Sequence, residues 1–297
     1  MSATLRDSAI EHYARRVDAV LAQRTRLRGP QPPGDLFGSL PPTHPLMLVD
    51  PRGPLDENLQ VLASYVGPED VLIDVGGGAG RMSLPLASRC REVINIDPSP
   101  GMGAAFRANA AKGGVENARF IESVWPARDP PVGTVALVSH VTYFIREIWP
   151  FLEQVERVGP ERVLLIVGSD PPPPGWHREL FALLYGEAEE IVPSLPEMAN
   201  VLWEQGRLPE IRVLPRGRRT TDLAGATREQ AVTAAIGRFG VEQWASWPLG
   251  QELTDRLRHL LESRFEDLFA ETPAGIVPRW LPPSRDVLIT WTPSDYQ

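Results

Sequence analysis

The residues best placed to do chemistry begin with an acidic side chain and a run of glycines. A short apolar run, 71–75, contains Asp74 and is typical of a buried parallel strand. It is followed by Gly76, Gly77, Gly78 and Gly80. Glycine lets the backbone approach a ligand closely, and the N–H groups of a helix that starts after such a turn face that ligand. The pattern therefore indicates a loop that binds a ligand with its backbone.

The spacing of these glycines excludes two common phosphate-binding motifs. The dinucleotide fingerprint G-x-G-x-x-G needs glycine in its sixth position, and Arg81 or Ser83 stands there in this sequence. The P-loop needs G-K-[ST], which does not occur in the chain. The loop is thus of another kind.

A second acidic residue follows at the end of the next apolar run. Asp97 closes the run 92–97, and Pro98 and Met102 come after it. A strand, a loop, a helix and a second strand bring the Asp97 carboxylate back beside the glycine turn, where it can accept from both hydroxyls of a ribose. A simple cap at the strand end is the alternative role for Asp97, and helix packing is the alternative for Met102.

Together these segments resemble the first motifs of class I S-adenosylmethionine-dependent methyltransferases. Asp74, Gly76, Gly78 and Gly80 fill the pattern acidic–hydrophobic–G-x-G-x-G, and residues 97–102 are similar to its D-x-S-x-x-M continuation. The resemblance implies that S-adenosylmethionine is the cofactor and S-adenosylhomocysteine the product. It implies that Asp74 contacts the methionine moiety and Asp97 the ribose. A helix cap is the other interpretation of Asp74.

The third motif departs from the family pattern. Relatives often carry an acidic residue here that accepts from the adenine amino group, and in this alignment Val124 takes its place. Glu122, Ser123 and Trp125 are the remaining candidates for contacts to the adenine. Trp125 could stack on the base or could belong to the core, and the two interpretations stay open.

The chemistry is expected at the end of the fourth strand, where Ser139, His140 and Tyr143 follow an apolar run. Methyl transfer from a sulfonium needs mainly alignment of the nucleophile, and a general base helps when the nucleophile must lose a proton. His140 is the candidate base, with Tyr143 beside it, and Ser139 is expected on the cofactor side. Contact with the cofactor, or simple packing at the strand end, is the alternative role for His140.

The elements that position these residues alternate between strands and helices, which predicts an α/β fold. The resemblance implies a seven-stranded, mostly parallel, doubly wound sheet whose last strand is antiparallel. The expected strands are 71–75, 92–97, 118–122, 134–139, 162–168, 210–214 and 286–291. The expected helices are 8–23, 55–65, 81–89, 101–112, 150–158, 176–190, 195–206, 227–238 and 249–270.

Four segments are predicted along the chain. Residues 1–54 form an N-terminal helix and a proline-rich arm, and residues 55–168 form the cofactor-binding core. Residues 169–284 form a helical substrate cap that also supplies one sheet strand near 210–214, and residues 285–297 form the last strand and tail. Asp170, His177 and several tryptophans could line the substrate side; the tryptophans are Trp176, Trp203, Trp244, Trp247 and Trp280.

Composition limits the class of acceptor and the cellular location that we expect. A net charge of −8 argues against broad nucleic-acid binding, so a small molecule is favoured over a nucleic acid. The single cysteine fits a reducing cytosol, and the five histidines show no metal-ligand spacing. Because the sequence has neither a signal-like N-terminus nor an apolar run long enough for a membrane span, a cytoplasmic location without membrane contact is expected.

The predicted activity is methyl transfer to an O, N or C atom of a small molecule. Three alternatives remain: an enzyme of the same fold acting on RNA or protein, an aminopropyl transferase, and a catalytically silent cofactor-binding protein.

Overall fold

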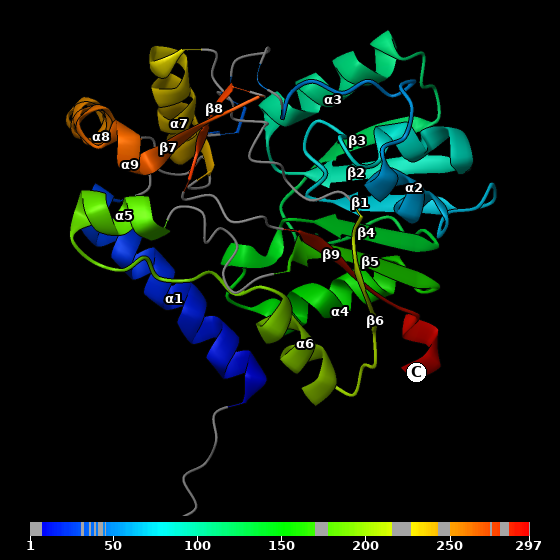
Figure 1. Ribbon diagram of the computed structural model, residues 1–297. Helices are drawn as coiled ribbons and strands as arrows, with labels where there is room; N and C mark the ends of the chain where they lie inside the picture. Colours follow the sequence, from blue (N-terminus) through cyan, green and yellow to red (C-terminus); the bar gives the residue numbers. More distant parts are fainter. Residues whose placement is uncertain are drawn as a thin grey trace, which may run out of the picture.

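The chain folds around one large sheet (Figure 1). The computed structural model describes residues 8–30, 33–35, 37–38, 40, 44, 46–169, 178–215, 227–242, 250–273, 275–279 and 285–296. The sheet has seven strands in the order β3-β2-β1-β4-β5-β9-β6, with β9 antiparallel to both of its neighbours. The expected doubly wound, mostly parallel sheet with an antiparallel last strand is therefore confirmed.

The strands of this sheet are β1 (Val71–Val75), β2 (Glu92–Asp97), β3 (Ala118–Glu122), β4 (Val135–Ser139), β5 (Arg162–Gly168), β6 (Glu210–Val213) and β9 (Asp286–Trp291). Register brings their carboxyl ends together, because Val75 of β1 lies opposite both Ile96 of β2 and Val138 of β4. The residues that follow these three strands therefore meet at one edge of the sheet, beside the point where the strand order reverses.

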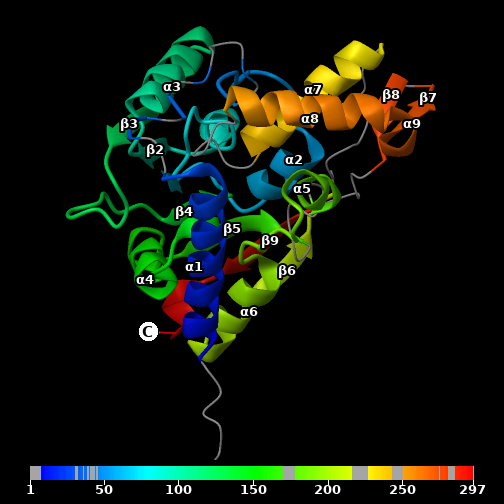
Figure 2. The same cartoon turned by 90° about the vertical axis from the view of Figure 1, so that its left-hand side faces the viewer.

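The helices and 3₁₀ turns are α1 (Ala9–Arg28), α2 (Glu57–Ala63), η1 (Leu84–Arg89), α3 (Pro100–Lys112), η2 (Thr142–Phe144), α4 (Ile148–Val158), α5 (Arg178–Tyr185), α6 (Leu195–Glu204), α7 (Arg228–Glu242), α8 (Gln251–Ser263), α9 (Phe265–Leu268) and η4 (Pro293–Tyr296). Figures 1 and 2 show α1, α4 and α6 on one face of the sheet and α2 and α3 on the other. Each face buries its own apolar cluster, centred on Phe151 of α4 and on Leu62 of α2.

A third apolar cluster lies away from the sheet. It joins α5, α7, α8 and α9 to the hairpin of β7 (Phe269–Thr272) and β8 (Gly275–Pro278), with Leu27 of α1 packed against it. Figure 1 shows this helical cap beside one end of the sheet, with α1 running from the sheet toward α5. The leading helix thus touches both the sheet and the cap.

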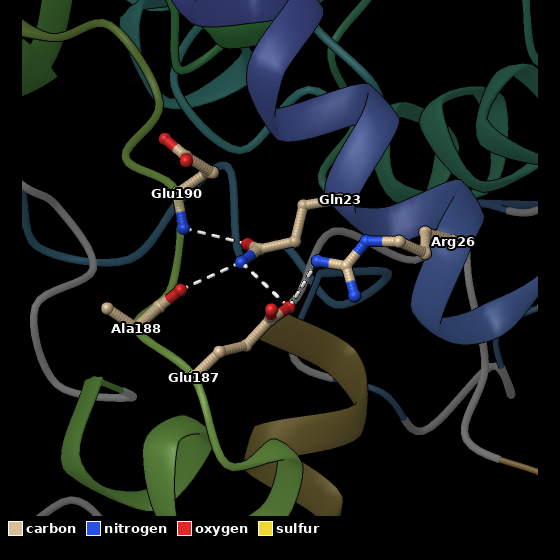
Figure 3. Close-up of polar contacts among 5 residues, drawn as sticks. All are labelled: Gln23, Arg26, Glu187, Ala188 and Glu190. Carbon is tan, nitrogen blue, oxygen red and sulfur yellow. Dashed lines mark hydrogen bonds and ion pairs between the residues drawn. The ribbon is translucent and has the colours of Figure 1, made fainter.

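Gln23 attaches the end of α1 to the chain that leaves α5 (Figure 3). Its amide nitrogen donates to the Ala188 carbonyl at 2.7 Å, and its amide oxygen accepts from the Glu190 N–H at 2.7 Å. Arg26 forms an ion pair with Glu187 in the same place. Because Gln23 is only 8% exposed, these bonds replace water that the side chain has lost, and they hold residues 187–190 against the helix.

Three sequence expectations need correction. The helix expected at 81–89 is the 3₁₀ turn η1, because Pro85 cannot donate to an α-helical ladder. The helix expected at 8–23 continues to Arg28, since buried polar side chains at its end hide the apolar stripe. The helix expected at 249–270 ends before the β7–β8 hairpin, whose four-residue strands are too short to show an alternating pattern.

Candidate active site

The loop after β1 is shaped by its glycines. Gly76, Gly78 and Gly80 have φ of 69°, 53° and 84°, in the left-handed region that disfavours other residues. Gly77 is needed for a different reason: a Cβ there would overlap the Asp74 carboxylate. The backbone of the loop therefore packs directly onto the acidic side chain of β1.

Asp74 is fully buried beneath this loop. Burial raises the pKa of Asp74 to about 7, although the nearby Ser83 hydroxyl lowers it, and neither carboxylate oxygen meets a partner at full hydrogen-bond geometry among the described residues. An acidic group of this kind is prepared for a donor that arrives with a ligand, since a buried oxygen without a partner costs free energy.

Asn95 of β2 supports the loop from below. Its amide nitrogen donates to the Gly78 carbonyl at 2.9 Å, and its side-chain oxygen is buried without a partner among the described residues. Sequence reasoning missed Asn95. The signal was present, because Asn95 is a polar residue within the otherwise apolar run 93–96.

Asp97 lies beside the loop at the end of β2. Its two oxygens accept from the Gly78 N–H at 3.0 Å and from the Ser99 N–H at 2.9 Å. Burial raises the pKa of Asp97, although these two hydrogen bonds oppose the change. The carboxylate is thus fixed by backbone groups while it faces the cavity described next.

A cavity of about 700 Å³ connects the glycine loop to the end of β4. The predicted site residues that line it are Asp74, Gly76, Gly77, Gly78, Asp97, Pro98, Met102, Ser139 and His140. The Ser139 hydroxyl is buried without a partner among the described residues. Gly80 is not in the lining; it packs behind the loop against Leu84 and Phe106.

The residues predicted to contact adenine lie at the end of β3, next to Asp97 of β2. Glu122, Ser123 and Trp125 are not among the lining residues of this cavity, and Val124 is 68% exposed. The Trp125 ring meets Phe151 edge to face, and its indole N–H donates to the Phe151 carbonyl at 3.4 Å. Of the two interpretations of Trp125, the structure favours the core, because its polar atom is engaged by the helix below the sheet.

His140 lies in a hydrogen-bond network at the end of β4. The Gly168 N–H donates to the Tyr143 hydroxyl at 3.0 Å, and the same hydroxyl forms a hydrogen bond with His140 Nδ1, 2.8 Å away. His140 Nε2 then faces Asp286 of β9 at 3.4 Å. Both ring nitrogens of His140 have a partner, and Tyr143 is buried and outside the cavity lining. The network therefore holds the end of β4 in place at the wall of the cavity. Sequence reasoning missed Asp286, which is far away in the chain.

The remaining candidates fall on other parts of the chain. Trp203 is exposed on α6. Asp170, His177, Trp176, Trp244, Trp247 and Trp280 lie outside the described residues. Within the described ranges, no cluster of three or more histidine, cysteine or acidic side chains could hold a metal ion, and no helix there is long and apolar enough to cross a membrane.

Comparison with known proteins agrees with this geometry. Residues 72–158 match the family model of a methyltransferase domain. The chain carries a class I S-adenosylmethionine-dependent methyltransferase domain. The match covers the glycine loop, Asp97 and the end of β4, so the cofactor of this domain is S-adenosylmethionine, as the resemblance implied.

Solved structures share the fold of the methyltransferase. A methyltransferase from Geobacter sulfurreducens, in complex with S-adenosylhomocysteine, is 15% identical with a TM-score of 0.51, covering 88% of this chain and 98% of that one. The YcgJ protein of Bacillus subtilis is 16% identical with a TM-score of 0.51, covering 78% of this chain and 96% of that one. At these identities the likeness establishes the fold.

Curated relatives match a shorter part of this chain than the solved structures do. The 23S rRNA (uracil(1939)-C(5))-methyltransferase RlmD of Marinomonas is 25% identical over 131 residues, 41% of this chain and 29% of that protein. The RlmD of Aeromonas salmonicida is 32% identical over 75 residues, 24% of this chain and 17% of that protein. This chain therefore spans less than a third of the length of either relative.

Proposed function

We propose that this methyltransferase transfers the methyl group of S-adenosylmethionine to an O, N or C atom of a small organic molecule. The observation that carries the proposal is the charge of the chain. The formal net charge is −8, and Arg81 is the one arginine among the described residues that line the cavity. Nucleic-acid sites concentrate basic side chains, so this balance favours a small-molecule acceptor.

The cofactor is held by residues of the glycine loop and β2. Asp97 accepts hydrogen bonds from the ribose hydroxyls. The backbone of Gly76, Gly77 and Gly78 lies against the ligand. The buried oxygens of Asp74 and Ser139 accept from donors of the methionine half. Gly80, Pro98 and Met102 shape the loop and the adenosine end. When bound, the cofactor supplies a sulfonium methyl that a nucleophile displaces in line.

His140 and Tyr143 have a positioning role in this proposal. The Asp286–His140–Tyr143 network fixes the end of β4, which aligns the wall where the methyl is transferred. A general base step at His140 would require one of its two ring nitrogens to leave its present partner. Cys90 is buried and unpaired, in keeping with a reducing, cytoplasmic location.

RNA is the second candidate acceptor, because the curated relatives above act on ribosomal RNA by name. The aligned stretches cover at most 41% of this chain. More than half of this chain lies outside each of these alignments, so the shared stretch does not carry a shared acceptor with it.

One labelling experiment separates these possibilities. The full chain is incubated with methyl-labelled S-adenosylmethionine and separate small-molecule, RNA and protein fractions of a bacterial lysate, with Asp97→Asn as the inactive control. We expect label in the small-molecule fraction only. Label in RNA or protein would contradict the proposed acceptor class, and label left on methylthioadenosine would indicate transfer of the aminocarboxypropyl group. A parallel assay with methyl-labelled decarboxylated S-adenosylmethionine would detect aminopropyl transfer in the same way. Binding of S-adenosylhomocysteine without labelling of any fraction would identify a silent binding protein.

A further inference from the structure

The proline-rich arm before the sheet contributes to the wall of the cofactor cavity. Gly34, Asp35, Phe37 and Leu46 line the same cavity as Asp97 and Met102. The residues that the sequence predicted for the adenine side, Glu122 to Trp125, are absent from that lining. The arm therefore occupies the side of the cavity that follows β2.

Asp35 binds the start of α3 from this arm. Its carboxylate accepts from the Ser99 hydroxyl at 2.8 Å, from the Gly101 N–H at 2.9 Å and from the Gly38 N–H at 2.8 Å. Burial would raise the pKa of Asp35, but the hydrogen bonds from Gly101, Ser99 and Gly38 outweigh it and lower the pKa. Asp35 is therefore held as an anion at the N-terminus of the helix, where the helix dipole favours negative charge.

Ser99 links Asp35 to the acid that faces the ribose. Its hydroxyl donates to Asp35 and accepts from the Met102 N–H at 2.9 Å, while its own N–H donates to Asp97 at 2.9 Å. A continuous chain of contacts thus runs from Asp35 through Ser99 to Asp97 and on to Gly78. Any shift of Asp35 changes the groups that fix the Asp97 carboxylate.

Further contacts hold the arm along α3. A Cβ on Gly101 would overlap the backbone of Gly38, so the two glycines meet without side chains between them. The buried amide of Asn109 donates to the Met47 carbonyl at 3.0 Å and to the Ala79 carbonyl at 3.2 Å, which joins the arm to the glycine loop. The arm is thus built into the same unit as the loop and α3.

We propose that the arm forms the adenosine side of the cofactor site: Asp35 is a positioning residue for Asp97, and Phe37 and Leu46 supply apolar contact to the base. This inference rests on the assignment of S-adenosylmethionine as cofactor. Phe37 is 37% exposed, so its ring is available to a ligand in the cavity. An aromatic ring and an aliphatic side chain beside a fixed carboxylate match a purine and its ribose.

Calorimetric titration tests the proposal with two ligands and the full chain. S-adenosylhomocysteine carries both halves of the cofactor, whereas 5′-methylthioadenosine lacks the amino-acid half. For Asp35→Ala and Phe37→Ala we expect both ligands to bind about tenfold more weakly, a factor typical of one charge-assisted hydrogen bond or one buried aromatic contact. Equal losses for the two ligands place the effect at the adenosine end.

Two more variants separate positioning from general damage. Asp50→Asn changes a carboxylate of the same arm that accepts from the Arg52 N–H at 3.1 Å and does not line the cavity, so its affinities should equal the wild type. If Asp35 acts through Ser99, then Ser99→Ala should weaken binding by itself, and adding Asp35→Ala to it should cost less than Asp35→Ala alone.

The outcomes are distinct. Unchanged affinities in Asp35→Ala and Phe37→Ala, or losses for S-adenosylhomocysteine alone, would overturn the inference while the methyltransferase assignment stands. Failure of the wild type to bind either ligand would instead overturn the cofactor assignment. If Asp35→Ala does not fold, Asp35→Asn and the exposed Phe37→Ala decide the matter with the same criteria.

Discussion

At the carboxyl ends of β1 and β2, most of the polar contacts have a backbone group on one side. At the ends of β4 and β5 and the start of β9, the contacts of His140 join side chains, and one of its partners, Asp286, lies far away in the chain. Asp97 is fixed by the N–H groups of Gly78 and Ser99, whereas His140 is fixed by Tyr143 and Asp286. Under the proposed function, the cofactor is therefore held mainly by backbone groups, whereas the wall proposed for the acceptor is built from side chains.

The largest effect is expected at the buried acid of the first region. Asp74 has a pKa of about 7 in the folded chain against 3.8 when exposed, so the folded state holds its proton more tightly. This contribution to stability is fully present below about pH 4 and is lost as pH rises to about 7, to a total of about 4 kcal/mol. Asp74→Asn removes the titration.

Urea unfolding of wild type and Asp74→Asn at several pH values measures this effect. Relative to the variant, the wild type should lose free energy of unfolding as pH rises from about 4 to 7. The difference between the two proteins should stay constant above that range. A difference that does not change with pH would show that Asp74 is ionised in the folded chain.

The next largest effect concerns packing behind the glycine loop. Gly80→Ala combines a φ of 84° with a Cβ 2.6 Å from Leu84 and 2.7 Å from Phe106, so we expect a loss of about 3 kcal/mol in the free energy of unfolding. Gly186→Ala is the matched control: its φ is 75°, and nothing lies within 4 Å of the added Cβ. The control should lose only about 1–2 kcal/mol. Equal losses would mean that the loop does not pack tightly on η1 and α3.

A comparison of two neighbouring acids tests the cofactor contacts. Asp97 and Glu122 pair across β2 and β3, but Asp97 alone of the two lines the cavity. We expect Asp97→Asn to weaken binding of S-adenosylhomocysteine about ten- to a hundredfold, as loss of hydrogen bonds to a charged group does, and Glu122→Gln to leave it unchanged. A loss with Glu122→Gln would restore the adenine contact that the third motif suggested.

The smallest effect is expected in the second region. Tyr143→Phe leaves the buried Gly168 N–H and His140 Nδ1 without the hydroxyl, at a cost of about 1–2 kcal/mol in thermal or urea unfolding. Tyr13→Phe is the control. The Thr142 carbonyl that Tyr13 contacts at 2.7 Å also accepts from the Ile145 N–H, so less is lost. A larger loss in Tyr13→Phe would show that α1, and not the network, fixes the end of β4.

Sequence reasoning identifies the residues whose constraint is local. Asp74, the glycines and Asp97 are recognisable because a backbone turn with positive φ and a carboxylate at a strand end need particular residues at particular spacings. It missed Asn95, although a polar residue within an apolar run marks that position. It also missed Asp35 and Asp286, whose contacts are with segments far away in the chain. For Trp125 it left stacking on adenine and packing in the core open, and a neighbouring helix engages the ring.

The sequence by itself determined the alternation of strands and helices and the glycine loop, because strand periodicity and backbone conformation restrict the residues directly. The order of the sheet and the identity of the cofactor were implied by the resemblance of its motifs to a family. Only the tertiary structure decided which side chains complete the walls. The arm reaches α3 through Asp35, and β9 brings Asp286 to His140, across separations that leave no spacing rule in the sequence. Contacts of this kind depend on which surfaces meet when the chain is packed, and that is a property of the whole fold.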